Sequence, residues 1–466
     1  MSVKARFCPS PTGRIHLGNA RTAILNALFA KSDQGVFLLR IEDTDPERST
    51  KEYADGLMTD LKWLGLDWDE GPGVEGEAGP YWQSQRQAVY DQYYDELISK
   101  DLAYPCFCSE EQLAMTRKVQ RASGKPPRYP GTCRHLSEDE INSKLAEGLK
   151  PTLRFKIPAG DVVEFNDAVK GPQKFETAVI GDFIIRRVDG TPTFMYCNAI
   201  DDALMGVTHV MRGDDHLTNS PRQALLLRAL GLPEPIYCHI SLIVGSDNAP
   251  LSKRHGSKSV EELRQAGFLP IGILNYLARL GHYYEDSEFM TQDELAKKFR
   301  LESLSKSPAK FDKDQMLYWQ REAVARVDDE TLWQWFGEDV HGLVPGDKQQ
   351  AFIAAIRPNV EFPAQALQWA KVFFTDTLEI ADEHQDIVNN AGQAVFQAAL
   401  EGANQHGEDF KAISQYVKDA AGVKGKALFQ PLRVALTGVL HGPDMGSICQ
   451  LLGAGRIQQR FENVLR

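Results

Sequence analysis

Apolar runs and helix-like segments alternate over the first eighty residues. The run 5–8 leads into the turn-rich segment 9–13, and small and apolar residues then recur at helical spacing between residues 20 and 28. The run 36–41 predicts a strand covered on both faces, and Asp45 followed by Pro46 predicts the start of another helix. Strands that alternate with helices indicate a doubly wound α/β sheet, in which ligands bind beyond the carboxyl ends of the strands.

The pattern changes twice further along the chain. Residues 81–181 lose the α/β alternation and indicate an inserted module, after which the strand-like runs 183–185, 208–211 and 240–244 resume it. From about residue 259 the pattern is almost wholly helical. We therefore predict an α/β multidomain protein, with a Rossmann-like domain at 1–80 and 182–245, an insertion at 81–181, a further domain at 246–325 and an all-helical region at 326–466.

Composition narrows the class of protein. The 466 residues are 42% hydrophobic and 25% charged, which is typical of a globular chain. The net charge of −12 argues against a general nucleic-acid coat or a membrane-surface protein. Seven cysteines are too few for a disulfide framework, and neither a signal peptide nor an apolar run of about 18 residues is present. We expect a cytoplasmic protein without a membrane partner.

Four metal-ligand residues are clustered within the insertion. Cys106, Cys108, Cys133 and His135 form a C-x-C and C-x-H pair separated by 24 residues. Three thiolates and an imidazole make a closed tetrahedral shell, the structural type of zinc site. The competing interpretation is two pairs of free or buried thiols. We predict one structural Zn²⁺ per chain.

Two short motifs point to phosphate chemistry. His16, Gly18 and Asn19 fall where the first loop enters the first helix, so an imidazole and a helix N-terminus face an anion together. Taken alone, the same residues are equally typical of a helix cap beside an incidental histidine. The loop 251–256 follows the last strand-like run and carries Ser252, Lys253 and Arg254. A basic loop can close on a phosphate whose charge rises in the transition state, although by itself it is more often simply solvated.

Taken together, these motifs resemble those of a known family. The segment PSPTGRIHLGNART at 9–22 resembles the HIGH signature of class I aminoacyl-tRNA synthetases in its bacterial glutamyl form, and LSKRHG at 251–256 resembles the KMSKS loop. Pro250 stands where many relatives have a lysine. The resemblance implies a catalytic set and an ATP-binding set that overlap. They are His16, Gly18, Asn19, Lys253 and Arg254 for catalysis, and His16, Gly18, Ser252 and Lys253 for ATP.

The resemblance also implies a pocket for glutamate. Planar guanidinium groups bind carboxylates through two parallel hydrogen bonds, so arginines are expected there. Phe194 stands where relatives place a tyrosine, which removes a phenol unless Tyr196 or Asn198 replaces it. Which arginine would bind which carboxylate is left open. The implied glutamate-binding residues are Arg6, Cys8, Ser10, Glu42, Phe194, Asn198 and Arg212.

These expectations add up to one predicted function. The resemblance implies a monomeric glutamate–tRNA ligase that uses ATP with Mg²⁺, L-glutamate and tRNA(Glu), with the insertion at the acceptor end and the helical region at the anticodon. A variant that also charges tRNA(Gln) remains the alternative. A small-molecule nucleotidyltransferase, a shortened tRNA-modifying glutamyl transferase and a non-catalytic tRNA-binding module fit the chain's length and motifs less well.

Overall fold

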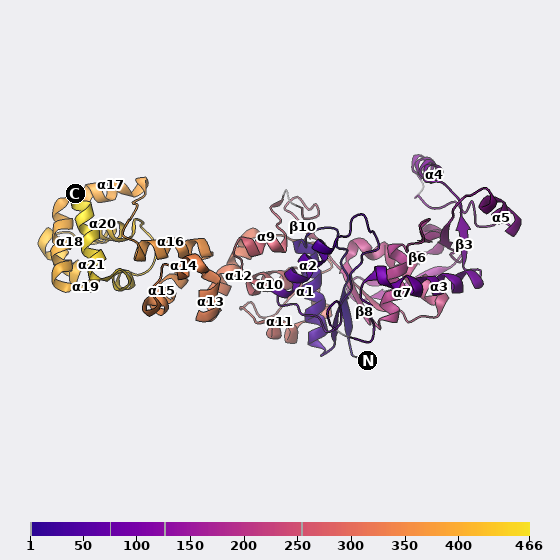
Figure 1. The fold of residues 1–466 in the computed structure, drawn as a ribbon, viewed down its shortest axis with the longest axis horizontal. Coiled ribbons are helices and arrows are strands. Elements are labelled where there is room, and N and C mark those ends of the chain that lie inside the picture. Colours follow the sequence, from indigo (N-terminus) through magenta and orange to yellow (C-terminus); the bar gives the residue numbers. More distant parts are fainter. Residues whose placement is uncertain (1, 75, 125–126, 253–254) are drawn as a thin grey trace. The chain divides into compact units, whose positions relative to one another are not determined.

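The computed structural model describes residues 2–74, 76–124, 127–252 and 255–466 (Figure 1). The chain divides into two compact units. The first consists of Met1–Leu263 and Ile273–Lys313, and the second of Arg264–Gly272 and Asp314–Arg466.

A four-stranded parallel sheet forms the centre of the first unit. Its strands are β1 (Lys4–Phe7), β2 (Val36–Leu39), β8 (His209–Gly213) and β9 (Ile236–Ile240), in the order β2-β1-β8-β9. The connection from β1 to β2 runs through α1 (Leu17–Ser32), which is buried along most of its length. The doubly wound α/β sheet predicted from the sequence is confirmed.

The second helix begins later than its cap signal predicts. α2 spans Lys51–Trp63, and the hydroxyl of Thr50 accepts a hydrogen bond from the Tyr53 amide at its start. Asp45 instead binds Arg48 within a turn, with 2.7 Å between Oδ2 and Nε. The predicted start at Pro46 was therefore wrong, because a threonine closer to the apolar stripe caps the helix and the aspartate has a local ion-pair partner.

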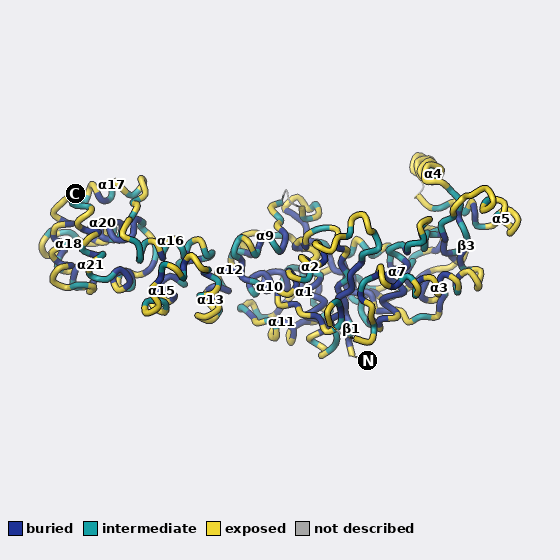
Figure 2. The backbone as a smooth tube through the Cα atoms, in the orientation of Figure 1, coloured by how far each residue is buried: buried dark blue, intermediate teal, exposed yellow. Residues whose placement is uncertain are grey.

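The insertion is built around a small antiparallel sheet of order β3-β4-β7 and a separate hairpin of β5 and β6. Residues 183–185 lie in β7, which pairs antiparallel with β4, so this run belongs to the small sheet and not to the parallel one. Helix α4 buries none of its residues and is exposed along its length (Figure 2). The elements of this region are η1 (Gln83–Arg86), α3 (Gln87–Ser99), β3 (Ala103–Cys106), α4 (Glu110–Ala122), α5 (Glu138–Ala146), β4 (Thr152–Phe155), β5 (Val162–Asp167), β6 (Gly171–Glu176), α6 (Thr177–Ile180) and β7 (Phe183–Arg186).

Besides β8 and β9, further helices and short strands follow β7 in the chain. They are α7 (Phe194–Leu204), η2 (Asp214–Asn219), α8 (Ser220–Leu230), β10 (Ile243–Val244), α9 (Val260–Gln265), α10 (Pro270–Arg279), α11 (Gln292–Lys298), η4 (Leu301–Ser303) and β11 (Ala309–Lys310). The strand-like run 240–244 is split, because its first residue ends β9 and its last two form β10, which pairs with β11.

The described part of the second unit is helical, as its amphipathic pattern predicts. Helix α20 contains the buried Pro431, and α18, α19 and α21 pack against one another. The elements are α12 (Lys313–Arg326), α13 (Asp329–Phe336), α14 (Glu338–His341), η5 (Gly346–Lys348), α15 (Gln349–Ile356), η6 (Arg357–Asn359), α16 (Pro363–Phe374), α17 (Asp382–Ala391), α18 (Gln393–His406), α19 (Phe410–Ala421), α20 (Lys426–Thr437) and α21 (Met445–Leu465). Across the described residues, no helix combines the length and the apolar character that a membrane crossing requires.

Candidate active site and metal cluster

A cavity of about 370 Å³ opens beyond the carboxyl ends of the parallel strands. Its walls come from the loops after β1, β2, β8 and β9, together with the first turn of α1 and the start of α7. This is the place where open α/β sheets bind their ligands. Seven of the lining residues are those that the resemblance implies for glutamate, namely Arg6, Cys8, Ser10, Glu42, Phe194, Asn198 and Arg212.

The two arginines in this set have different partners. Arg6 donates from Nε to Oδ1 of Asp202 at 3.1 Å and from Nη2 to Oδ2 at 3.3 Å, so a carboxylate of the chain already neutralises it. Arg212 donates from Nη2 to the neutral oxygens of Ser220 and Gln223, and its Nη1 is buried without a hydrogen-bond partner among the described residues. Burial lowers the pKa of Arg212. An incoming carboxylate would therefore find its unmet donor on Arg212.

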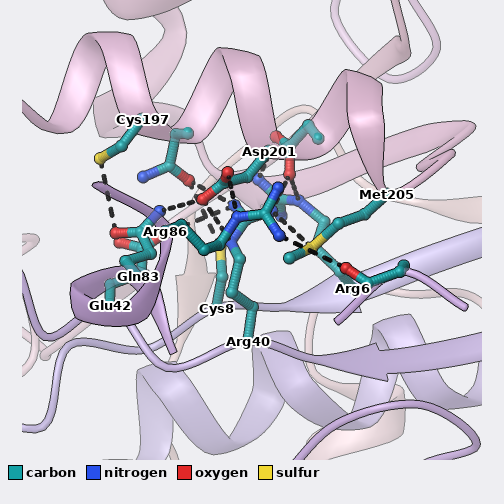
Figure 3. A network of polar contacts seen from close by, with 12 residues as sticks. Arg6, Cys8, Arg40, Glu42, Gln83, Arg86, Cys197, Asp201 and Met205 are labelled. Atoms are coloured by element: carbon teal, nitrogen blue, oxygen red, sulfur yellow. Dashed lines mark hydrogen bonds and ion pairs between the residues drawn. The ribbon is translucent and has the colours of Figure 1, made fainter. Parts of the chain in front are cut away.

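A buried ion network connects several residues of the cavity wall (Figure 3). Arg40 donates from Nη1 to Asp202 at 2.8 Å and from Nη2 to Oδ1 of Asn198 at 2.9 Å, and its Nη2 lies 3.6 Å from Glu42. Burial by itself would lower the pKa of Arg40, but the surrounding acids raise it well above its ordinary value. The network holds the side chains of Arg6, Asn198 and Glu42 in fixed positions relative to one another.

Asp201, the neighbour of Asp202 on α7, extends this network toward the insertion. It accepts hydrogen bonds from Arg86 at 2.7 Å, from Gln83 at 2.9 Å and from the Tyr90 hydroxyl at 2.7 Å. Sequence analysis did not single out Arg40, Asp201 or Asp202. The available signal was a pair of acidic residues inside the otherwise apolar helix FMYCNAIDDAL, since acids on a buried face need cationic partners.

Glu42 and Phe194 both line the cavity. Burial raises the pKa of Glu42, and Arg40 opposes that shift. Phe194 begins α7 with its ring 5.4 Å from that of His216. Tyr196 is fully buried and donates its hydroxyl to the Tyr90 carbonyl, so it does not replace the missing phenol. Asn198 does line the cavity.

The residues implied for phosphate binding lie at the start of α1. His16 is the exposed residue that precedes the helix, and Gly18 and Asn19 line the cavity mouth. A Cβ on Gly18 would meet no atom within 4 Å, so the space beside it is open to a ligand. The backbone after the 251–256 loop binds this same segment, because the Val260 amide donates to the Ile15 carbonyl at 2.9 Å. Ser252 is exposed, and Lys253 and Arg254 lie outside the described residues.

Three thiols meet in the insertion at the end of β3. The sulfurs of Cys106, Cys108 and Cys133 all lie within 4.8 Å of one another, with 3.7 Å between those of Cys108 and Cys133. A tetrahedral zinc site with bonds of about 2.3 Å has sulfur pairs about 3.8 Å apart, so this spacing fits the ion. His135 is exposed and does not belong to the group.

A phenol lies beside the thiols. The Tyr129 hydroxyl is 3.4 Å from the sulfur of Cys106 and 3.6 Å from that of Cys108, and it accepts a hydrogen bond from the Cys133 amide at 2.8 Å. Burial would raise the pKa of Cys106, but hydrogen bonds from Tyr129 and Arg154 lower it to about 7. The pKa of Cys108 is raised to about 11, and burial is the largest cause. The four remaining cysteines, like these three, are free thiols.

A parallel α/β sheet with a cavity at the carboxyl ends of its strands defines a class of ligand-binding α/β proteins. Sequence comparison identifies the family within that class. Residues 2–318 match the family described as tRNA synthetases class I (E and Q), catalytic domain, and residues 286–465 match an anticodon binding domain. The chain belongs to the class I tRNA synthetases of this E and Q family.

Particular relatives resemble the whole chain. Glutamate–tRNA ligase 2 of Nitrosococcus oceani is 56% identical over 462 residues, covering 99% of this chain and 98% of that protein. Glutamate–tRNA ligase 2 of Coxiella burnetii is 54% identical, covering 99% of each. The crystal structure of a glutamate tRNA ligase from Elizabethkingia meningosepticum, in complex with its amino acid, superposes with a TM-score of 0.90 at 29% identity, covering 100% of this chain and 99% of that one.

Proposed function

We propose that this chain is a glutamate–tRNA ligase of protein synthesis. It joins L-glutamate to ATP, forming glutamyl-adenylate and pyrophosphate, and then transfers the glutamyl group to the 3′ end of tRNA(Glu). The observation that carries the proposal is Arg212, a buried guanidinium that lines the cavity with Nη1 unpaired among the described residues. Full-length identity of 50–56% to glutamate–tRNA ligases supports it.

In the first step, an α-carboxylate oxygen of glutamate attacks the α-phosphorus of ATP, and the bond to the bridging oxygen of pyrophosphate breaks. The α1 N-terminus with His16 and Gly18 stabilises the phosphates, and Ser252, Lys253 and Arg254 of the loop follow the departing pyrophosphate. Mg²⁺ accompanying ATP neutralises phosphate charge. The geometry needs no protein nucleophile, so catalysis is a matter of position and electrostatics.

The amino acid is held by charge complementarity. Arg212 binds a glutamate carboxylate through Nη1, and the Glu42 carboxylate faces the ammonium group. Arg6, already paired with Asp202, shapes the cavity wall. In the second step a hydroxyl of the terminal ribose attacks the glutamyl carbonyl, AMP leaves, and the hydroxyl proton is released. The second unit, which matches an anticodon binding domain, would read the tRNA.

Pyrophosphate exchange into ATP tests the function directly. We expect exchange with glutamate in the presence of tRNA(Glu), and none when tRNA(Gln) replaces it. Exchange with both tRNAs would instead establish the variant that also charges tRNA(Gln). The absence of exchange with glutamate under every condition would refute the proposal. Gel filtration of the same sample tests the expected monomer, and cell fractionation tests the cytoplasm as its compartment.

We further propose that the insertion holds one structural Zn²⁺ on Cys106, Cys108 and Cys133, with a fourth ligand from either His135 or Tyr129. His135 is the ligand implied by the resemblance, and the Tyr129 hydroxyl is supported by its distances to two of the sulfurs. With four protein ligands no position is open for substrate, so the ion stabilises the insertion and takes no part in the reaction.

Replacing Cys133 with serine is expected to remove the metal, because zinc binding depends on the full set of thiolates. Elemental analysis of protein purified without chelator checks this, and Cys449→Ser, a buried thiol of the second unit, is the control that should retain zinc. His135→Ala and Tyr129→Phe then assign the fourth ligand. With Co²⁺ bound in place of Zn²⁺ as a spectroscopic probe, the fourth ligand is the residue whose loss weakens metal binding. Wild-type protein with less than about half an ion per chain would refute the zinc site.

A further inference from the structure

A second set of buried polar residues lies behind Arg212, outside the cavity. Asp167 ends β5, His239 lies in β9, and Ser220 and Gln223 belong to α8. All four are at most 2% exposed, and none lines the cavity. Burying such polar groups costs folding free energy unless they form hydrogen bonds with one another, so their arrangement requires an explanation.

The tautomer of His239 follows from its partners. Its Nδ1 lies 2.6 Å from Oδ2 of Asp167, whose carboxylate can only accept, so Nδ1 carries the proton. The turn 168–170 fixes the carboxylate, because the amides of Val169 and Lys170 donate to it at 2.9 and 2.7 Å. Burial lowers the pKa of His239, so the ring is neutral and its Nε2 is an acceptor, which the Nε of Arg212 contacts.

On this side, the acceptors that Arg212 meets among the described residues are all neutral. Its Nε donates to His239 Nε2 at 3.4 Å, and its Nη2 donates to Ser220 Oγ at 2.8 Å and to Gln223 Oε1 at 2.7 Å. The Ser220 hydroxyl is also 3.1 Å from His239 Nε2 and can donate to it. The guanidinium is rigid and planar, so fixing Nε and Nη2 also fixes where Nη1 points.

We propose that Asp167, His239, Ser220 and Gln223 position Arg212, so that its Nη1 faces the carboxylate of the bound amino acid. They act through Arg212 and touch no substrate. Because the acceptors that the structure describes around Arg212 are uncharged, the guanidinium is oriented without being neutralised, and its charge remains available for the ligand. This assignment rests on the proposed function. It names four further residues that determine the affinity for glutamate through Arg212.

The insertion takes part in this arrangement through the turn between β5 and β6. Besides Asp167, the turn provides Lys170, whose ammonium lies 2.7 Å from Asp214 and 2.9 Å from the Lys306 carbonyl. Asp214 directly follows Gly213, which lines the cavity. The hairpin is thus joined to the central sheet at two points, at His239 of β9 and at Asp214 directly after β8.

Two isosteric substitutions of His239 separate positioning from simple packing. An asparagine amide can replace Nδ1 and keep the bond to Asp167, whereas a glutamine amide can replace Nε2 and keep an acceptor for Arg212. We expect His239→Asn to raise the KM for glutamate about 10-fold or more, because a hydrogen bond to a charged group is lost. The kcat and the KM for ATP should change less than about 3-fold. His239→Gln should lie closer to wild type.

The KM and kcat values are measured by tRNA-dependent pyrophosphate exchange with the full-length protein. Thermal unfolding of each variant shows whether it is folded. If wild-type protein shows no exchange with glutamate, the proposed function has failed. If wild type is active, the positioning role is overturned by equal impairment of the two variants, by parallel changes in both KM values, or by no change. Should His239→Asn not fold, Gln223→Met removes one acceptor of Nη2 and must raise the KM for glutamate alone.

Discussion

Replacing Arg212 with alanine is expected to raise the KM for glutamate about 10²- to 10³-fold in tRNA-dependent pyrophosphate exchange. Leaving one charge of a buried pair uncompensated typically costs about 3–5 kcal/mol, and each 1.4 kcal/mol is a factor of ten in affinity. Among the residues that the structure describes, Arg212 is the cavity guanidinium that combines burial with an unpaired Nη1, so little else compensates for its loss. The KM for ATP should change far less.

Two further variants make this result specific. Arg212→Lys keeps the positive charge, but the three donors of an ammonium share one nitrogen, which cannot occupy the positions of both Nη2 beside Ser220 and Gln223 and Nη1, so it should remain strongly impaired. Arg48→Ala removes an exposed arginine whose ion pair lies on the surface, and it should match wild type. A normal KM for glutamate in Arg212→Ala would contradict the assigned role.

Replacing Asp202 with asparagine is expected to lower the free energy of unfolding of the first unit by about 3–5 kcal/mol. Asp202 is 2% exposed and accepts from Arg6 and Arg40, two arginines that are themselves nearly inaccessible to solvent. The pKa of Asp202 is lowered although burial opposes this, since both guanidinium groups favour its charged form. An amide would leave the two buried cations without the anion between them.

Because the chain has two compact units, a single unfolding transition is not assumed, and hydrogen exchange of peptides from β1 and α7 is the suitable measurement. Glu96→Gln is the matched control, since it breaks the exposed pair with Lys100 and should cost under about 0.5 kcal/mol. Equal protection in Asp202→Asn and wild type would mean that Asp202 does not hold the network together.

Much of the architecture was predictable because it follows from local periodicity. Apolar runs identified β1 and β2, and the helical spacing after residue 20 identified α1. The prediction failed where partners distant in sequence decide the outcome. Residues 183–185 form a strand as predicted, but only pairing with β4 assigns that strand to the antiparallel sheet. The start of α2 depended on whether Asp45 or Thr50 caps the helix, and the ion pair of Asp45 with Arg48 leaves Thr50 as the cap.

The resemblance implied the residues of the cavity, and the geometry of the parallel sheet explains why they meet. In a parallel sheet the carboxyl ends of the strands meet at one edge, so motifs that follow successive strands come together. Arg6, Glu42 and Arg212 lie within or just after β1, β2 and β8, and all three line the cavity. Their positions at the ends of successive parallel strands therefore predict that they lie close together in space.

The sequence by itself determined the fold class and the three thiols, because the alternation of strands with helices and the spacing of the ligands are local properties of the chain, and the resemblance of its motifs implied the residues that line the cavity. Only the tertiary structure decided how charge is distributed among them. Arg6 and Arg212 look alike in sequence, but Asp202 neutralises the first, while the second meets neutral acceptors and keeps Nη1 unpaired among the described residues. Ion pairing depends on distances between side chains far apart in sequence, and no local pattern records them.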